Sequence, residues 1–103
     1  MGPEARIEKY VVARSRVLGA IVLKVQALAV RGFPDRLFVW HGGLIELVEF
    51  KAPEGCLSAA QKSLIGKFAQ RDIDIQVVAS MDAATRFLQK RRDYLARLKN
   101  RET

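Results

Sequence analysis

The sequence has one cysteine, one histidine and no long apolar run. Because Cys56 is the single cysteine, an internal disulfide and a cysteine-rich zinc site are excluded. A single histidine, His41, supports neither a Cys–His nucleophile pair nor a zinc cluster. No stretch approaches the roughly 18 apolar residues of a membrane-spanning helix, and residues 1–10 lack the apolar region of a secretory signal. We therefore expect a cytoplasmic protein whose chemistry rests on carboxylates and amines.

The length and composition are those of a small folded protein. The chain has 103 residues, of which 50% are hydrophobic and 28% are charged. This composition is typical of a folded domain and not of a disordered segment. A domain of this size buries only about 60–70% of the surface that its unfolded chain exposes, so it cannot also enclose a large cofactor. We expect residues 1–103 to form a single domain.

Positive charge is in excess, but it is unevenly distributed along the chain. The net charge is +7, from 18 basic and 11 acidic residues. Residues 6–36 and residues 86–103 each hold seven basic and two acidic side chains, whereas residues 37–85 hold four basic and six acidic ones. The excess points to a polyanionic partner, either nucleic acid or an anionic membrane surface. An acidic centre between basic flanks suits a metal-dependent nuclease, although ordinary surface acids would give the same count.

Apolar periodicity and turn residues predict the order α-β-β-β-α-β-α, a mixed sheet flanked by helices in the α/β class. The helices are predicted at 4–18, at 58–70 and from 80 almost to the end, and the strands at 20–25, 36–40, 44–51 and 74–79. A loop is expected at 27–34. The core positions expected on the first and last helices are Ile7, Tyr10, Val11, Ser15, Val17, Leu18, Met81, Ala84, Phe87, Leu88, Arg91, Tyr94, Leu95 and Leu98.

The strand at 44–51 carries two charged residues at its end. Alternation places Glu49 and Lys51 on one face with Ile45 and Leu47, and the opposite face is also mostly apolar. We therefore expect this strand to be central and covered on both faces. Charged side chains at the end of such a strand are costly to bury unless they have a function or lie at the rim.

The hairpin loop determines which residue faces Glu49. If the loop consists of His41, Gly42 and Gly43, Asp35 lies directly opposite Glu49, whereas a two-residue loop would shift the pairing. Like charges opposite one another destabilise a ladder, and a divalent cation between them reverses that effect. A salt bridge from Lys51 to either acid is the structural alternative.

Two further polar residues lie next to predicted apolar stripes. Gln61 follows Ser58 by three residues, the spacing of a capping box, and it also borders the buried side of its helix. Glu8 borders the apolar stripe of the first helix. A carboxylate in a first helical turn is otherwise explained by the helix dipole and by solvation.

Three stretches together resemble the PD-(D/E)xK nuclease pattern: Gly32-Phe33-Pro34-Asp35, Glu49-Phe50-Lys51 and Leu57-Ser58-Ala59-Ala60-Gln61. More narrowly, the chain resembles the virus-type replication-repair nuclease (VRR-NUC) domain in its minimal stand-alone form, which is typical of bacteria and phages. The resemblance runs from about residue 7 to residue 88. It implies a restriction-endonuclease-like core.

The resemblance also implies roles for the matching residues. Asp35 and Glu49 would be the primary ligands of Mg²⁺ or Mn²⁺, helped by the backbone carbonyl of Phe50. Lys51 would position or deprotonate the attacking water and stabilise charge on the phosphate. Glu8 would reach the metal site directly or through water, and Gln61 would orient Lys51 or the nucleophile.

The reaction implied is metal-dependent hydrolysis of DNA phosphodiester bonds, with recognition of DNA shape and not of sequence. The candidate contacts to the DNA backbone are Arg6, Arg14, Arg16, Lys24, Arg31 and the basic C-terminal run. Stand-alone members of the family resemble dimeric enzymes that resolve Holliday junctions, so a homodimer is expected. Tyr94, Leu95 and Leu98 would form part of the dimer surface or fold back on their own domain. The rival hypotheses are a non-catalytic nucleic-acid-binding module that retains the fold and a regulator that contacts protein.

Overall fold

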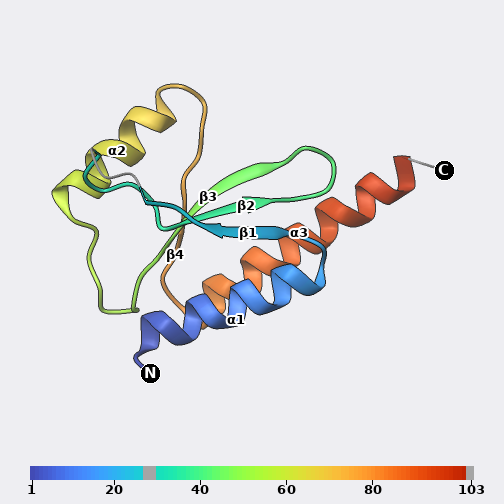
Figure 1. Cartoon of the computed structure of the whole chain (residues 1–103), viewed down its shortest axis with the longest axis horizontal. Helices are drawn as coiled ribbons and strands as arrows, with labels where there is room; N and C mark the ends of the chain where they lie inside the picture. Colours follow the sequence, from blue (N-terminus) through green and yellow to red (C-terminus); the bar gives the residue numbers. More distant parts are fainter. Residues whose placement is uncertain (27–29, 102–103) are drawn as a thin grey trace.

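The structure is a computed structural model that describes residues 1–26 and 30–101 (Figure 1). Its elements follow the predicted order, so the predicted mixed α/β class is confirmed. They are α1 (Pro3–Val17), β1 (Ile21–Lys24), β2 (Arg36–Val39), β3 (Ile45–Phe50), α2 (Ala59–Ala69), β4 (Gln76–Val78) and α3 (Met81–Arg101). Of the loop expected at 27–34, residues 27–29 lie outside the described residues.

The four strands form one mixed sheet in the order β1-β2-β3-β4. The first two pairings are antiparallel, and β4 joins β3 in parallel. In the β2–β3 hairpin Arg36 pairs with Val48, and the backbone N–H of Trp40 donates to the carbonyl of Leu44 at 2.8 Å. This register is the one expected for a three-residue loop, and its continuation places Asp35 opposite Glu49.

One face of the sheet is covered by α1 and α3, which run side by side along it (Figure 1). The core between these layers contains Ile7, Val11, Phe38, Val48, Phe50, Phe87 and Leu88. Two predicted core positions are wrong: Val17 is 87% exposed and Met81 is 45% exposed. Each is an end residue of its helix, beyond the turns that contact the sheet, and Val12 is buried in place of Val17.

The other face of the sheet is largely open. Helix α2 lies beyond one end of the strands, away from α1 and α3 (Figure 1), and none of its residues is fully buried. Its apolar side chains at Leu64, Ile65 and Phe68 are only half-buried, and Ile45 on the open face is 62% exposed. The expectation that β3 is covered on both faces is therefore wrong, because α2 shields only the end at which Glu49 lies.

The distal half of α3 folds back on its own domain. The Tyr94 hydroxyl donates to the carbonyl of His41 at 2.7 Å, and the side chains of Tyr94 and Leu95 pack against the core. A Cβ atom on Gly42 would lie 2.6 Å from a methyl carbon of Leu98, so the hairpin tip contacts this stretch closely. Of the two alternatives for this apolar stripe, packing within the chain is the one observed. Among the described helices, none is long and apolar enough to cross a membrane.

Candidate active site

Glu49 is the buried centre of the candidate site. It is the last residue but one of β3, and only 4% of its surface is exposed. Its Oε2 accepts a hydrogen bond from Nε2 of Gln61 at 3.1 Å and lies 3.6 Å from Nζ of Lys51. Its Oε1 is buried and has no hydrogen-bond partner within the part of the chain that the structure describes. An unpartnered carboxylate oxygen in the interior is costly, so this atom points to a missing ligand.

Electrostatics at Glu49 favour the same conclusion. Burial raises the pKa of Glu49, the carboxylate of Asp35 raises it further, and Lys51 opposes the shift. Glu4, in the first turn of α1, adds a smaller rise to the pKa. A nearby divalent cation stabilises the ionised carboxylate and reverses this tendency.

Backbone hydrogen bonding of Asp35 to the residue after the neighbouring strand fixes its position at the site. Pro34 before it is fully buried, and the carbonyl of Asp35 accepts a hydrogen bond from the N–H of Val25 at 2.8 Å. The ladder from β1 through β2 thus continues to this residue, while its side chain is exposed. One exposed and one buried carboxylate therefore meet at the end of the β2–β3 pair.

Lys51 is held on the same face as Glu49 by a similar extension of the sheet. Its backbone N–H donates to the carbonyl of Val78 at 3.1 Å, one step beyond the last paired residue of β3. Its side chain is 21% exposed, so the ammonium group is partly open to solvent. The salt bridge to Glu49 considered as the structural alternative is present, and it leaves Nζ accessible to a substrate.

Gln61 joins helix α2 to the site. Its backbone N–H donates to Oγ of Ser58 at 3.1 Å, and its side-chain Oε1 accepts from the N–H of Ser58 at 2.8 Å. This is the predicted capping box. The capping box uses the amide oxygen of Gln61 and leaves Nε2 to donate to Glu49. One side chain therefore both caps the N-terminus of the helix and orients the buried carboxylate.

Gly32 allows α2 to approach closely enough for that contact. Its φ is +79°, and a Cβ atom there would lie 2.5 Å from the carbonyl carbon of Ala60. No side chain fits at that separation. Phe33 adds an edge-to-face contact with Phe68, with ring centroids 6.3 Å apart. The predicted Gly-x-Pro-Asp element therefore both docks α2 and delivers Asp35.

Glu8 is oriented towards Arg36, a residue that the sequence did not indicate as part of the site. Its Oε2 accepts from Nε of Arg36 at 2.9 Å, and both side chains are partly exposed. Glu4 is the second residue missed, and its charge slightly raises the pKa of Glu49. The i, i+4 spacing of Glu4 and Glu8 could have indicated a shared helix face, and Arg36 is adjacent to Asp35.

The individually named DNA contacts, from Arg6 to Arg31, are all exposed and lie in three places on the surface. In the predicted basic C-terminal run, Arg91 is buried and pairs with Glu46 instead. Arg16 lines a groove of about 450 Å³ beside α1 with Lys9, Glu8 and Arg36, and Lys24 pairs with Arg36 in the sheet. A second groove of about 270 Å³ beside α2 contains Arg31 and Lys67. The third place is a hollow of about 410 Å³ lined in part by Arg6 and Tyr10, and the guanidinium of Arg14 stacks on the Tyr10 ring at 3.8 Å.

The donor set fits a cation that relies partly on solvent and substrate. Across residues 1–26 and 30–101 no three His, Cys, Asp or Glu side chains cluster as metal ligands. Mg²⁺ is commonly held by one or two carboxylates plus water and phosphate oxygens. Asp35, Glu49 and the carbonyl of Phe50 at the strand end supply such a partial set, and the free Oε1 of Glu49 is available to it.

Comparisons with known proteins identify similar domains. A family model described as the VRR-NUC domain matches residues 13–82. A solved structure titled "VRR_NUC domain" is 27% identical and superposes with a TM-score of 0.80, covering 86% of this chain and 97% of the other. No curated protein matches the chain. The predicted resemblance and the fold are thereby confirmed.

Proposed function

Because the chain belongs to the VRR-NUC domain family, whose fold is of nuclease type, we propose that it is a metal-dependent deoxyribonuclease hydrolysing phosphodiester bonds. The observation that carries this proposal is the half-satisfied carboxylate of Glu49, held by Gln61 and Lys51 opposite Asp35. We propose that residues 1–103 act as one nuclease domain. The exposed, unpaired thiol of Cys56 suits a reducing compartment, and we place the protein in the cytoplasm.

Asp35, Glu49 and the carbonyl of Phe50 would hold Mg²⁺ or Mn²⁺. When bound, the ion would act as a Lewis acid towards a phosphate oxygen and would lower the pKa of a bound water. Glu8 contributes to the same site directly or through water once it leaves Arg36. In the absence of substrate, the salt bridge to Arg36 holds the Glu8 carboxylate beside the first residue of β2.

Lys51 acts on the nucleophile and on the phosphate. Its ammonium group lies at the edge of the buried site, where it orients the attacking water and donates to the phosphate oxygen on which negative charge develops. Gln61 keeps the Glu49 carboxylate in one orientation through its Nε2 hydrogen bond. Because the capping box fixes the Gln61 side chain, this orientation requires no rearrangement when DNA binds.

Binding to DNA would depend on its backbone. Arg6, Arg14, Arg16, Lys24 and Arg31 are exposed around the carboxylates, which supports contacts with phosphates on several sides of the cut. Such contacts read the path of the backbone and not the bases. We therefore propose selectivity for branched or otherwise structured DNA, including Holliday junctions.

We further propose a homodimer that pairs through the open face of the sheet. Ile21, Leu23 and Ile45 on this face are 60%, 48% and 62% exposed, and they adjoin an apolar groove of about 520 Å³ bounded by Phe68 and Ile73. Two copies that each carry +7 repel one another, so a mostly apolar stretch of surface is the part that can meet its own copy. A dimer presents two sites to the two strands of a junction.

Sedimentation of Ile45→Glu tests the dimer. A charge at the centre of an apolar interface opposes pairing, so the wild-type protein should sediment as a dimer and the variant as a monomer. Val17→Glu, on the exposed end of α1, is the matched control and should leave the dimer intact. A monomeric wild type, or a dimeric Ile45→Glu, overturns the proposed interface.

The nuclease proposal is tested by incubating the protein with branched, flap and linear DNA in Mg²⁺, Mn²⁺ or EDTA. We expect cleavage of the branched and flap substrates with either metal and none in EDTA. Removing the ammonium group in Lys51→Ala should slow cleavage by about 10²–10³-fold, because a preorganised electrostatic contact is lost. Asp35→Ala should abolish metal-dependent cleavage.

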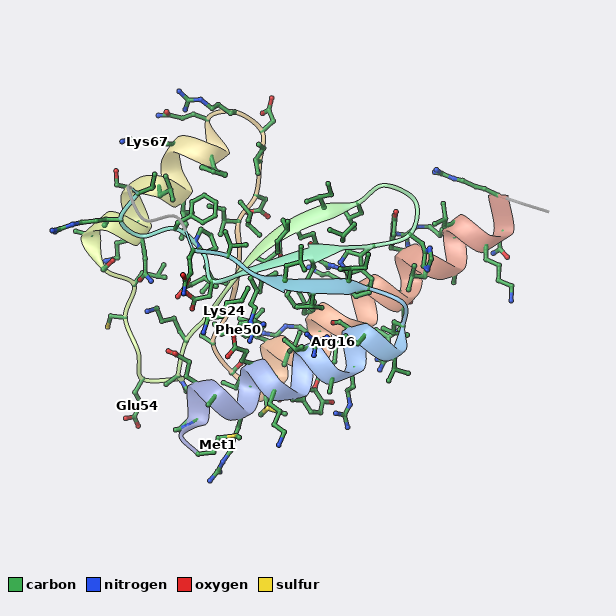
Figure 2. The ribbon with its side chains drawn as sticks, viewed as in Figure 1. Met1, Arg16, Lys24, Phe50, Glu54 and Lys67 are labelled. Carbon is green, nitrogen blue, oxygen red and sulfur yellow. The ribbon has the colours of Figure 1, made fainter. Side chains whose placement is uncertain are left out.

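Two exposed residues provide matched controls. Lys62→Ala removes a lysine of α2 outside the site, and Glu54→Gln neutralises an acid in the loop after β3 (Figure 2). Both should cut DNA as the wild type does. Cleavage that survives both Lys51→Ala and Asp35→Ala would refute the mechanism. DNA binding without cleavage in either metal would favour the non-catalytic binding module.

A further inference from the structure

A hollow next to the carboxylates is used by none of the roles above, apart from a phosphate contact assigned to Arg6. It has a volume of about 410 Å³. Its walls come from α1, from the loop after β3 and from the first residue of α3: Pro3, Arg6, Ile7, Tyr10, Pro53 and Met81. Met81 is 45% exposed there although its position in the helical pattern predicted burial. The hollow therefore presents apolar surface to solvent on a strongly basic molecule.

The hollow is close to the proposed point of cleavage. Ile7 immediately precedes Glu8, and Pro53 follows Lys51 by two residues. Two residues of extended chain span at most about 7 Å, which limits the distance between the backbones of Lys51 and Pro53.

The lining has the chemistry that receives a flat, polar-edged ring. The phenol of Tyr10, the rings of two prolines and the thioether of Met81 are flat or compliant apolar surfaces. Arg14 stacks on the Tyr10 ring, so the aromatic surface is backed by positive charge. The Arg6 side chain has no ion-pair or hydrogen-bond partner among the residues placed by the structure and remains available to a ligand. Bases stack on aromatic rings and on guanidinium groups in single-stranded nucleic acid sites.

We propose that this hollow binds one unpaired nucleobase of the DNA substrate, near the scissile phosphate. The proposal rests on the proposed nuclease function and deepens it by naming a substrate feature. A base that is paired and stacked in a duplex cannot enter, so the hollow favours DNA with an unpaired nucleotide beside the cut. Arg6 contacts the phosphate or the edge of the same nucleotide.

The test removes the base from the DNA and the receiving surface from the protein. A duplex with a single-stranded arm is prepared with an abasic site at each of the first three unpaired positions in turn. Binding is measured by fluorescence anisotropy in EDTA, where metal-dependent cleavage cannot proceed. With the wild type, we expect the abasic site at one position to weaken binding about tenfold, the loss typical of one stacked base. With Tyr10→Leu combined with Met81→Ala, the abasic and intact substrates should bind equally well.

The control and the second variant guard against indirect effects. Val17→Ala, at the opposite end of α1 and 87% exposed, should retain the full abasic penalty. Met81→Ala alone alters a partly exposed side chain at the helix start, and it should fold normally and reduce the penalty. Because no charge changes in these variants, the salt dependence of binding should stay the same.

Three results would overturn the proposal: no penalty at any position, the same penalty in the wild type and both variants, or no DNA binding at all. If the abasic penalty is the same in the wild type and both variants, but the variants no longer bind an apolar peptide, the hollow would instead be a site of protein contact. The proposed function fails separately. If the protein shows the abasic penalty but never cuts DNA, the base site stands and the nuclease proposal fails. If it cuts DNA without the penalty, the nuclease proposal stands and the base site fails.

Discussion

Strand β3 carries two buried carboxylates, three residues apart, on opposite faces of the sheet. Glu46 is 8% exposed and Glu49 is 4% exposed. Both oxygens of Glu46 accept hydrogen bonds from the guanidinium of Arg91, whose Nε lies 2.7 Å from Oε1. In contrast, only Oε2 of Glu49 has partners, while Oε1 has none among the described residues. Burial also raises the pKa of Glu49.

The difference between the two carboxylates separates a structural role from a functional one. Glu46 faces α3, and Arg91 neutralises it with both donors of a rigid fork while also stacking on the ring of Phe87. Glu49 lies at the end of the strand, where Lys51 and Gln61 orient it without satisfying it. Burial alone therefore does not distinguish the proposed metal ligand from a structural carboxylate, whereas the unfilled hydrogen-bonding capacity of Glu49 does.

Neutralising Glu49 is the strongest test of the different roles of Glu46 and Glu49. We expect Glu49→Gln to slow DNA cleavage by at least about 10³-fold, because a cation ligand is lost. The free energy of unfolding should change by less than about 0.5 kcal/mol or rise, because the amide removes a buried charge that faces Asp35. Single-turnover cleavage and urea denaturation measure the two effects. Cleavage within tenfold of the wild type would contradict the assignment.

The same substitution at Glu46 should have the opposite consequences. Glu46→Gln leaves the Arg91 guanidinium buried without a counter-ion, which should lower the free energy of unfolding by about 3–5 kcal/mol. Cleavage by the folded fraction should remain near the wild-type rate. Adding Arg91→Met removes the stranded charge, so the double variant should regain most of the stability. A loss below about 1 kcal/mol in Glu46→Gln would show that this pair is not structural.

Gln61 should have a smaller effect than Glu49, since it acts through that carboxylate. We expect Gln61→Ala to lower the cleavage rate by about 10–100-fold, as is usual for residues that orient a metal ligand. Ser58→Ala is the matched control, because it removes the cap at a cost of about 1 kcal/mol but leaves the Gln61–Glu49 hydrogen bond. If both variants lose activity equally, Gln61 contributes only the helix cap.

The smallest expected effect is the stabilisation of the fold by a divalent cation. A ligand that binds only the folded state, at ten times its Kd, adds about 1.4 kcal/mol to the free energy of unfolding. Mg²⁺ should therefore raise the Tm of the wild type and of Glu46→Gln by several degrees. Glu49→Gln should show no rise beyond that caused by NaCl of equal ionic strength. An equal rise in all three proteins would place the cation elsewhere.

Much of the fold could be predicted because its elements depend on local patterns. The capping box of Ser58 and Gln61, the helical spacing of Ile7 and Val11 and the short hairpin loop are all properties of neighbouring residues. The loop length also sets the hairpin register: the sequence placed Asp35 opposite Glu49 for a three-residue loop, and the structure has that register. The wrong core positions, Val17 and Met81, lie at helix ends, where periodicity cannot tell which turns contact the sheet.

The partners of the charged groups were less accessible. The Glu46–Arg91 pair joins residues 45 positions apart, and the sequence pattern marked Arg91 only as a core position. Likewise, the pairing of Glu8 with Arg36 spans 28 residues and depends on how α1 crosses the sheet. Spacing rules reach about four residues along a helix, so they cannot identify such pairs.

The sequence by itself determined the element order, the position of the hairpin loop and the set of residues that resemble a nuclease motif, because each follows from spacing along the chain. Only the tertiary structure decided that Glu46 is neutralised while one oxygen of Glu49 is not, that one sheet face is open, and that a hollow lies beside the site. The reason is physical. Burial, desolvation and the satisfaction of hydrogen bonds depend on which distant segments cover a residue, and that coverage exists only after the helices pack.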